Sequence, residues 1–133
     1  MIKRTLFIAA RIAAVFITLV AVVLVIMFTV NIILGTKPYI VSTDSMSDTL
    51  FKGDMIFVKE INPSGLKEGD IITYTMTNSN IVVTHRVVRI EEETGFIITK
   101  GDNNQSEDAP ALPENLIGLY VYKIPGFKFL VKE

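Results

Sequence analysis

Three polar regions of the chain hold the side chains that could carry out chemistry. The first is "YIVSTDSMSDTLFKGD", residues 39–54, which contains three Ser, two Thr and three Asp. The second is His85, the only histidine, and the third is the loop "GDNNQSEDAPALPEN", residues 101–115. A serine becomes a nucleophile when a base takes its proton and a third group orients that base. The three regions therefore offer hydroxyls, a base and carboxylates for nucleophilic catalysis.

Few side chains can serve as the base. Carboxylates are poor acceptors for an alcohol proton at neutral pH, which leaves His85 or a Lys that is desolvated enough to be neutral. His85 lies in "VVTHRVVRI", where strand alternation places it on one face with Val83, Val87 and Arg89. A lone His in a half-buried strand is also a common packed core residue, so the residue types alone leave the base undecided.

Composition excludes several other kinds of site. The chain has no Cys, so disulfides, thiol catalysis and zinc–thiolate sites are excluded. A single His is too few for a histidine-rich metal site, and we expect neither a metal nor another cofactor. All 14 Asp and Glu, but only 10 of the 13 Lys and Arg, lie after residue 35, which leaves no basic patch for nucleic acid.

An uncharged apolar segment precedes the polar regions. Between Arg11 and Lys37 it reads "IAAVFITLVAVVLVIMFTVNIILGT", and a helix that spans a bilayer needs roughly 20 apolar residues. A cleaved signal peptide is the alternative, but its apolar core would be about 7–15 residues and would be followed by a small-residue cleavage site. No such site follows here, so we predict an uncleaved membrane anchor.

The charges around this segment predict its orientation. Lys3, Arg4 and Arg11 precede it with no acidic residue beside them, and basic residues favour the cytoplasmic side. We therefore predict a single-pass protein of the cell membrane. Residues 1–35 would form the cytoplasmic N-terminus and the transmembrane anchor, and residues 36–133 an extracytoplasmic domain.

The extracytoplasmic domain is predicted to be mainly β. Short runs of β-branched and aromatic residues alternate with turn-forming residues, and residues 78–80 and 93–95 have the composition of turns. The predicted strands are Met55–Lys59, Ile71–Met76, Ile81–Ile90, Phe96–Lys100 and Leu119–Ile124. Five antiparallel strands suit a small closed or partly open barrel.

Four short motifs occur in the sequence in the same order as in a known family. They are "DSMSDTLFKGDMIFV", "GDIITY", "VTHRVVRI" and "ITKGDNNQSED", and all follow the apolar segment. Together they resemble the type I signal peptidases, in the Ser-His form of the endoplasmic reticulum, archaea and some Gram-positive bacteria. The resemblance covers the chain from the anchor to about Val121, and implies a signal-peptidase-like β barrel.

The resemblance also implies roles for individual residues. The family's box S-G-S-M-x-P-T-L maps onto residues 43–50, which makes Ser45 the nucleophile and implies that Thr43 and the Ser45 N–H form the oxyanion hole. The family's T/V-H-R motif maps onto residues 84–86, which makes His85 the general base. Asp108 corresponds to the acid that completes the triad, with Asp102 as the alternative.

Two positions depart from the family pattern. Asp44 stands where the family usually has Gly, and Asp48 stands where it usually has Pro. Carboxylates near a developing oxyanion oppose its charge unless they point to solvent. The position of these two side chains therefore bears on activity and substrate preference.

The resemblance predicts a membrane-anchored serine endopeptidase that cleaves signal peptides from exported preproteins. Ser45 is ten residues beyond Gly35, so the chain can place it at most roughly 35 Å from the bilayer surface. The apolar sites for the small residues of the substrate could include Ile40, Met46 or Val83. The alternative is a non-catalytic anchored β module that binds exported proteins; an autocleaving Ser-Lys protease would need Lys in place of His85. No oligomeric state is predicted.

The predicted topology can be tested by protease accessibility. Protease added to intact cells or right-side-out vesicles should digest residues 36–133, because the basic flank keeps the other end in the cytoplasm. Complete protection in sealed vesicles, lost when detergent is added, would mean that the orientation is reversed.

Overall fold

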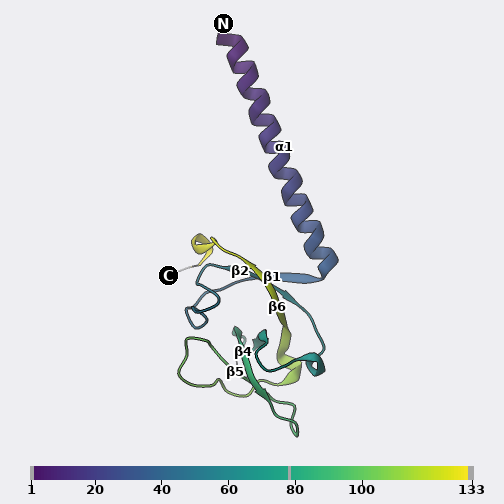
Figure 1. Ribbon diagram of the computed structural model, residues 1–133, viewed down its shortest axis with the longest axis vertical. Coiled ribbons are helices and arrows are strands. Elements are labelled where there is room, and N and C mark those ends of the chain that lie inside the picture. The colour runs from purple at the N-terminus through teal and green to yellow at the C-terminus, as the bar shows by residue number, and fades with distance from the viewer. Residues whose placement is uncertain (1, 78, 132–133) are drawn as a thin grey trace. The chain divides into compact units, whose positions relative to one another are not determined.

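The computed structural model describes residues 2–77 and 79–131, in two units (Figure 1). The units are Met1–Gly35, which contains the helix α1, and Thr36–Glu133, which contains the sheet. The protein is thus mainly β with one N-terminal apolar helix. Asn78, the first residue of the predicted turn at 78–80, lies outside the described residues.

The helix α1 spans Ile2–Leu34 and is long and apolar enough to cross a membrane. Its polar side chains bond to its own backbone: Thr18, Thr29 and Asn31 each donate to the carbonyl four residues earlier, at 2.8–2.9 Å. Such internal bonds satisfy polar groups that hydrocarbon cannot solvate. Gly35 follows with φ 64°, a left-handed conformation that ends helices and that glycine adopts at little cost.

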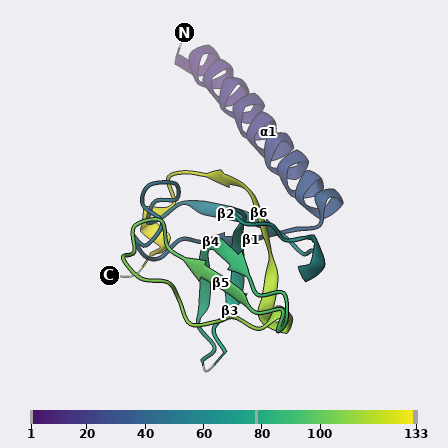
Figure 2. The same ribbon diagram turned by 60° about the horizontal axis from the view of Figure 1, so that its bottom comes forward.

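Within the described residues, one antiparallel sheet of six strands forms the second unit. The spatial order is β1-β2-β6-β3-β4-β5, so β6 lies between β2 and β3 at the centre (Figure 2). The part of the chain that the structure describes also contains the 3-10 helices η1 (Pro63–Gly65), η2 (Pro113–Asn115) and η3 (Lys128–Leu130), outside the strands. The strands are β1 (Thr36–Ile40), β2 (Met55–Lys59), β3 (Ile71–Thr75), β4 (Val82–Ile90), β5 (Ile97–Lys100) and β6 (Leu116–Ile124).

The sequence predicted five of these strands and missed β1. The prediction failed there because β1 is short and contains Lys37 and Pro38, which are uncommon within strands. Proline is tolerated on an edge strand, where its missing N–H faces away from the ladder, and β1 is an edge of this sheet. In the described part of the chain β1 pairs with β2 alone, so the sheet stays open.

A bulge in β4 also changes the predicted alternation. The register shifts between Val87 and Arg89, since Val87 pairs with Thr99 and Arg89 with Ile98. The extra residue reverses which face the later side chains take. As a result Ile90 packs on the core with Val87, whereas Arg89 bonds the exposed Glu107. The prediction that Arg89 shares the face of His85 was therefore wrong.

Two apolar clusters form the core. One contains Leu66, Ile72, Tyr74, Val87, Ile97 and Ala111, and the other Met46, Leu50, Ile56, Val58 and Ile71. Met46 and Leu50 of the predicted serine box, and Val87 two residues after His85, therefore belong to the core. Their burial fixes the backbone that carries the polar side chains between them.

Gly118 allows β2 and β6 to approach closely. A Cβ atom at this position would lie 2.3 Å from the carbonyl oxygen of Lys59. We expect Gly118→Ala to lower the unfolding free energy by about 1–3 kcal/mol, because overpacking would separate the two strands. Gly65→Ala is the matched control, since a Cβ there meets no atom within 4 Å. Urea unfolding of both variants tests this; equal stabilities would contradict the close approach.

Candidate active site

Ser45 lies on a helical turn that the core holds in place. The turn follows β1, and within it the backbone N–H of Leu50 donates to the carbonyl of Met46 at 2.6 Å. Met46 and Leu50 are 1% and 0% exposed, and both pack in the cluster with Ile56. Because these side chains are fixed, the backbone of Ser45 directly before Met46 has little freedom to move.

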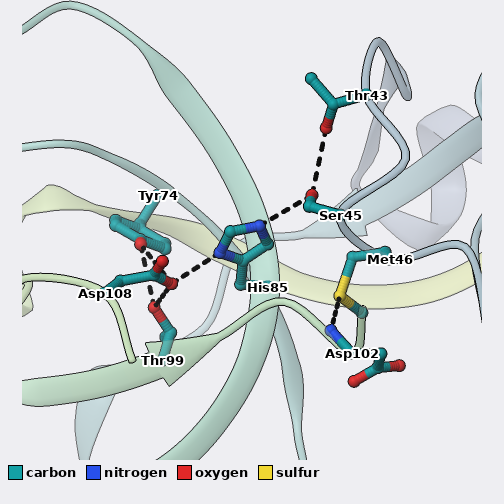
Figure 3. A network of polar contacts seen from close by, with 8 residues as sticks. All are labelled: Thr43, Ser45, Met46, Tyr74, His85, Thr99, Asp102 and Asp108. Carbon is teal, nitrogen blue, oxygen red and sulfur yellow. Dashed lines mark hydrogen bonds and ion pairs between the residues drawn. The ribbon is translucent and has the colours of Figure 1, made fainter. Parts of the chain in front are cut away.

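The imidazole of His85 connects the serine turn to the acidic loop (Figure 3). Its Nε2 lies 2.9 Å from Ser45 Oγ, and its Nδ1 lies 2.6 Å from Asp108 Oδ2. His85 is 7% exposed and pairs with Ile72 in the β3–β4 ladder. A carboxylate can only accept, so Nδ1 carries the proton and Nε2 is left to accept from the Ser45 hydroxyl.

Asp108 reaches His85 from the loop after β5 and is held there at two points. Its backbone N–H donates to the carbonyl of Thr99 at 2.8 Å, and its Oδ2 accepts from Thr99 Oγ1 at 2.7 Å. Burial opposes ionisation of this carboxyl, but hydrogen bonds from His85 and Thr99 outweigh it and keep the pKa of Asp108 below its ordinary value. Asp108 is therefore a carboxylate at neutral pH.

Thr43 lies on the other side of Ser45. Its Oγ1 is 3.1 Å from Ser45 Oγ, and Thr43 can be the donor while the Ser45 proton goes to His85 (Figure 3). Both Thr43 and the backbone N–H of Ser45 are donors close to the nucleophilic oxygen. This places the two predicted oxyanion-hole groups next to the predicted nucleophile.

Asp102 makes a different interaction from Asp108. Its two carboxylate oxygens accept from Arg86 Nε and Nη2 at 2.8 and 2.7 Å, and Oδ2 also accepts from Thr49 Oγ1 at 2.6 Å. The hydrogen bonds from Arg86 keep the pKa of Asp102 below its ordinary value. The structure thus brings Ser45, His85 and Asp108 together, and it pairs the alternative acid, Asp102, with Arg86.

The turn at residues 101–104 binds the serine turn directly. The backbone N–H of Asn103 donates to the carbonyl of Ser45 at 2.8 Å, and the N–H of Asp102 donates to the sulfur of Met46 at 3.3 Å. A Cβ at Gly101 would lie 2.6 Å from the same Ser45 carbonyl. Only glycine permits this approach, so Gly101 has a packing role beside the nucleophile.

The register between β4 and β5 shows on which face of the sheet Lys100, a lysine that could replace His85 as the base, places its side chain. Lys100 pairs with Arg86, and paired residues direct their side chains to the same face of a sheet. Arg86 follows His85 directly, so its side chain leaves the opposite face. The same rule places Lys100 away from Ser45, which favours His85 over Lys100 as the base.

A cavity of about 340 Å³ opens beside Ser45 and His85. Its walls include Ile40, Met46 and Val83, the three apolar residues that the sequence suggested for substrate sites. The cavity therefore has apolar walls on the side of the serine hydroxyl, where the side chains of a bound peptide could enter.

The two departures from the family pattern lie at the surface. Asp44 and Asp48 are both exposed. Asp48 lines a separate hollow together with Arg86 and Lys100. Water and the neighbouring cations reduce the effect of these carboxylates at Ser45. The repulsion that these two carboxylates would exert on an oxyanion at Ser45 is therefore weakened.

Sequence reasoning missed three polar residues that belong to these networks. Thr49 bonds Asp102, and Thr99 and Tyr74 both contact Asp108. Tyr74 and Thr99 lie in strands whose alternation resembles an ordinary core, so no local signal distinguished them. Within residues 2–77 and 79–131, no group of three His, Asp or Glu is arranged to hold a metal ion.

The sequence of this chain matches the profile of a known protein family over most of its length. The sequence profile of the family described as "Signal peptidase, peptidase S26" matches residues 9–108. The matched segment begins within α1 and ends at Asp108. It therefore includes Ser45, His85 and both acids of the loop.

Individual relatives carry names of the same kind. "Signal peptidase I W" of Bacillus subtilis is 39% identical over 90 residues, covering 64% of this chain and 47% of the relative. "Signal peptidase complex catalytic subunit SEC11" of Lachancea thermotolerans is 34% identical over 88 residues, covering 63% of this chain and 52% of the relative. The chain thus spans about half the length of these curated relatives.

The ion pair of Asp102 predicts a pH-dependent stability. Asp102→Asn should lower the unfolding free energy at neutral pH by about 1–3 kcal/mol, because the amide removes the negative charge and one of the two oxygens that accept from Arg86 and Thr49. Since the pKa of Asp102 is below 3.8 in the folded state, the wild type loses this contribution as the pH falls below 3.8. Urea unfolding at a series of pH values should show the two proteins converging in acid. A constant difference would rule out the ion pair as the cause.

Proposed function

The chain belongs to the signal peptidase family, peptidase S26, and on this premise we propose that it is a membrane-anchored serine endopeptidase that removes signal peptides from exported preproteins. The observation that carries the proposal is the continuous contact from Ser45 through His85 to Asp108, at 2.9 and 2.6 Å. A nucleophile, a base and an orienting carboxylate in this arrangement are the requirements of acyl transfer to serine.

In the proposed reaction, Ser45 Oγ attacks the carbonyl carbon of the scissile peptide bond. His85 Nε2 takes the hydroxyl proton, and Asp108 stabilises the imidazolium that forms. The Thr43 hydroxyl and the Ser45 N–H donate to the oxyanion of the tetrahedral intermediate. The intermediate collapses as His85 returns the proton to the leaving amine, which leaves an acyl group on Ser45. A water molecule then repeats the sequence, with His85 again as base, and releases the second product.

The apolar walls of the cavity and the anchor support this class of substrate. Ile40 and Val83 line the space beside the serine hydroxyl and would bind small apolar side chains of an extended peptide. Gly35 directly follows the apolar helix α1 and lies ten residues before Ser45, so the connecting chain keeps the nucleophile within roughly 35 Å of the membrane surface. Cleavage next to the apolar segment of a preprotein requires such proximity.

We propose the same location as the sequence predicted: a cell membrane, with the N-terminus in the cytoplasm and residues 36–133 on the other side. Three basic residues precede the apolar core of α1, and every acidic residue of the chain follows it. This distribution supports the orientation by the positive-inside rule. The proposed partners are the bilayer and the exported preproteins.

Alanine substitution at the two catalytic residues tests the proposal. We expect Ser45→Ala and His85→Ala each to lower cleavage of a preprotein by on the order of 10⁴–10⁶-fold, because either change removes the nucleophile or its activation. The double variant should be no slower than the slower single variant. The measurement is release of the signal peptide by the purified full-length protein in detergent, with thermal unfolding as the control for folding.

The same assay separates the proposed enzyme from a non-catalytic module that binds exported proteins. A wild-type protein that binds the preprotein and releases no product would favour the module. Retention of more than a tenth of the wild-type rate by His85→Ala would instead remove His85 as base.

Asp108→Asn should lose on the order of 10⁴ in rate with little change in melting temperature, since an amide favours the wrong tautomer of His85.

A further inference from the structure

The carboxylate of Asp108 has more hydrogen-bond donors than His85 alone. Its Oδ2 accepts from His85 Nδ1 at 2.6 Å and from Thr99 Oγ1 at 2.7 Å, and the Tyr74 hydroxyl lies 3.3 Å from the same oxygen. The Tyr74 and Thr99 hydroxyls are also 2.9 Å apart. These three side chains surround one carboxylate oxygen and come from three different strands, β3, β4 and β5 (Figure 3).

The strand register explains why these two hydroxyls flank His85. His85 pairs with Ile72, so Tyr74 is its diagonal neighbour on β3, opposite Val83. On the other side, Thr99 of β5 pairs with Val87 and is the second diagonal neighbour. Diagonal positions share a face of the sheet. Tyr74 and Thr99 therefore lie on the same face as His85, one on each side of it.

Proton counting gives this chain of bonds a direction. A hydroxyl has a single proton to donate. The Thr99 proton goes to Asp108, which can only accept, so between the two hydroxyls Tyr74 must donate to Thr99. The Tyr74 hydroxyl therefore donates to Thr99, and the Thr99 hydroxyl donates to Asp108. The Asp108 carboxylate also accepts from His85 Nδ1.

Both hydroxyls are shielded from water. Thr99 is 0% exposed and Tyr74 is 2% exposed. Burial, assisted by the nearby charge of Asp108, raises the pKa of Tyr74 to about 12. The phenol therefore remains a neutral donor at any pH at which the enzyme would work. Water cannot readily replace either donor at this depth.

We propose that Tyr74 and Thr99 are positioning residues whose hydroxyls, acting in series, hold the Asp108 carboxylate against the Nδ1 side of His85. The loop that carries Asp108 has no regular secondary structure between Gly101 and Pro110, so the carboxylate depends on such contacts for its orientation. Thr99 provides the main contact, because it binds both the backbone and the side chain of Asp108. Tyr74 supports Thr99 from behind.

The first test is spectroscopic and does not depend on proteolysis. His85 is the only histidine of the chain, so its Nδ1 proton gives a single NMR signal in full-length, histidine-labelled protein in detergent. A short bond to a carboxylate moves this signal downfield and protects the proton from exchange with water. We expect Thr99→Val and Tyr74→Phe, which keep shape but remove the hydroxyl, to move the signal upfield and to accelerate the exchange.

The second test is kinetic and rests on the proposed peptidase function. Thr99→Val should lower kcat for preprotein cleavage by roughly 10–100-fold and Tyr74→Phe by roughly 3–10-fold, the range that one lost buried hydrogen bond produces. KM should stay within about twofold, because neither residue touches the substrate. Thr99→Ser, which keeps the hydroxyl, should restore most of kcat and the downfield signal.

Thr73→Val is the matched control. Thr73 is 0% exposed and lies next to Tyr74, but its hydroxyl bonds Thr84 on the opposite face of the strands at 2.8 Å. Thr73→Val should lower the unfolding free energy about as much as Thr99→Val does, because each change removes one buried hydroxyl. It should nevertheless keep the His85 signal and keep kcat within about threefold. A control that loses the signal as much as Thr99→Val would show that the loss reports packing alone and would overturn the proposal.

The outcomes separate this inference from the function on which its second test rests. An unchanged His85 signal in both Thr99→Val and Tyr74→Phe overturns the positioning role, whatever the kinetics. Full kcat in Thr99→Val overturns it as well. A wild-type protein that cleaves no preprotein contradicts the proposed function instead, and the NMR comparison still decides whether the two hydroxyls hold Asp108.

Discussion

The active-site geometry depends on one imidazole that is bonded at both of its nitrogens. His85 can accept from Ser45 only if Nδ1 holds the proton, and Nδ1 holds the proton because Asp108 lies 2.6 Å away and can only accept. A carboxylate displaced by one rotamer would allow the other tautomer, with its proton on the nitrogen that must act as base. The fold therefore has to fix three segments that are distant in sequence relative to one ring.

Several contacts meet this requirement, and most are made by neighbours of the three residues. Met46 and Leu50 anchor the serine turn in the core, and the turn after β5 binds that segment through Asn103 and the close approach of Gly101. Lys123 adds a second attachment at the far end of the segment, where its ammonium binds both the Thr49 carbonyl and Asp54. Together these contacts hold the nucleophile between two rigid elements, as a preorganised site requires.

The sequence predicted much of this arrangement, and the reasons for its failures are physical. Runs of β-branched and aromatic residues between turn-forming residues located β2 to β6 to within a few residues. β1 was missed because an edge strand tolerates Lys37 and Pro38, and the Val88 bulge was missed because an inserted residue leaves no mark in composition. Ser45, His85 and Asp108 were predicted by resemblance to a family. Tyr74 and Thr99 were not, because a hydroxyl inside a strand is distinguished only by the register of its neighbours.

The two acids of the loop show how environment assigns different roles to the same side chain. Asp102 binds a guanidinium that never loses its charge, so its partner is constant and the pair serves to fix the turn on Thr49 and Arg86. Asp108 binds a ring that must gain and lose a proton during the proposed reaction. A carboxylate with that role cannot be neutralised by a permanent cation, since an imidazolium beside it would then be poorly stabilised. The neutral hydroxyls of Thr99 and Tyr74 avoid this conflict: they hold the carboxylate in position and leave its negative charge for His85.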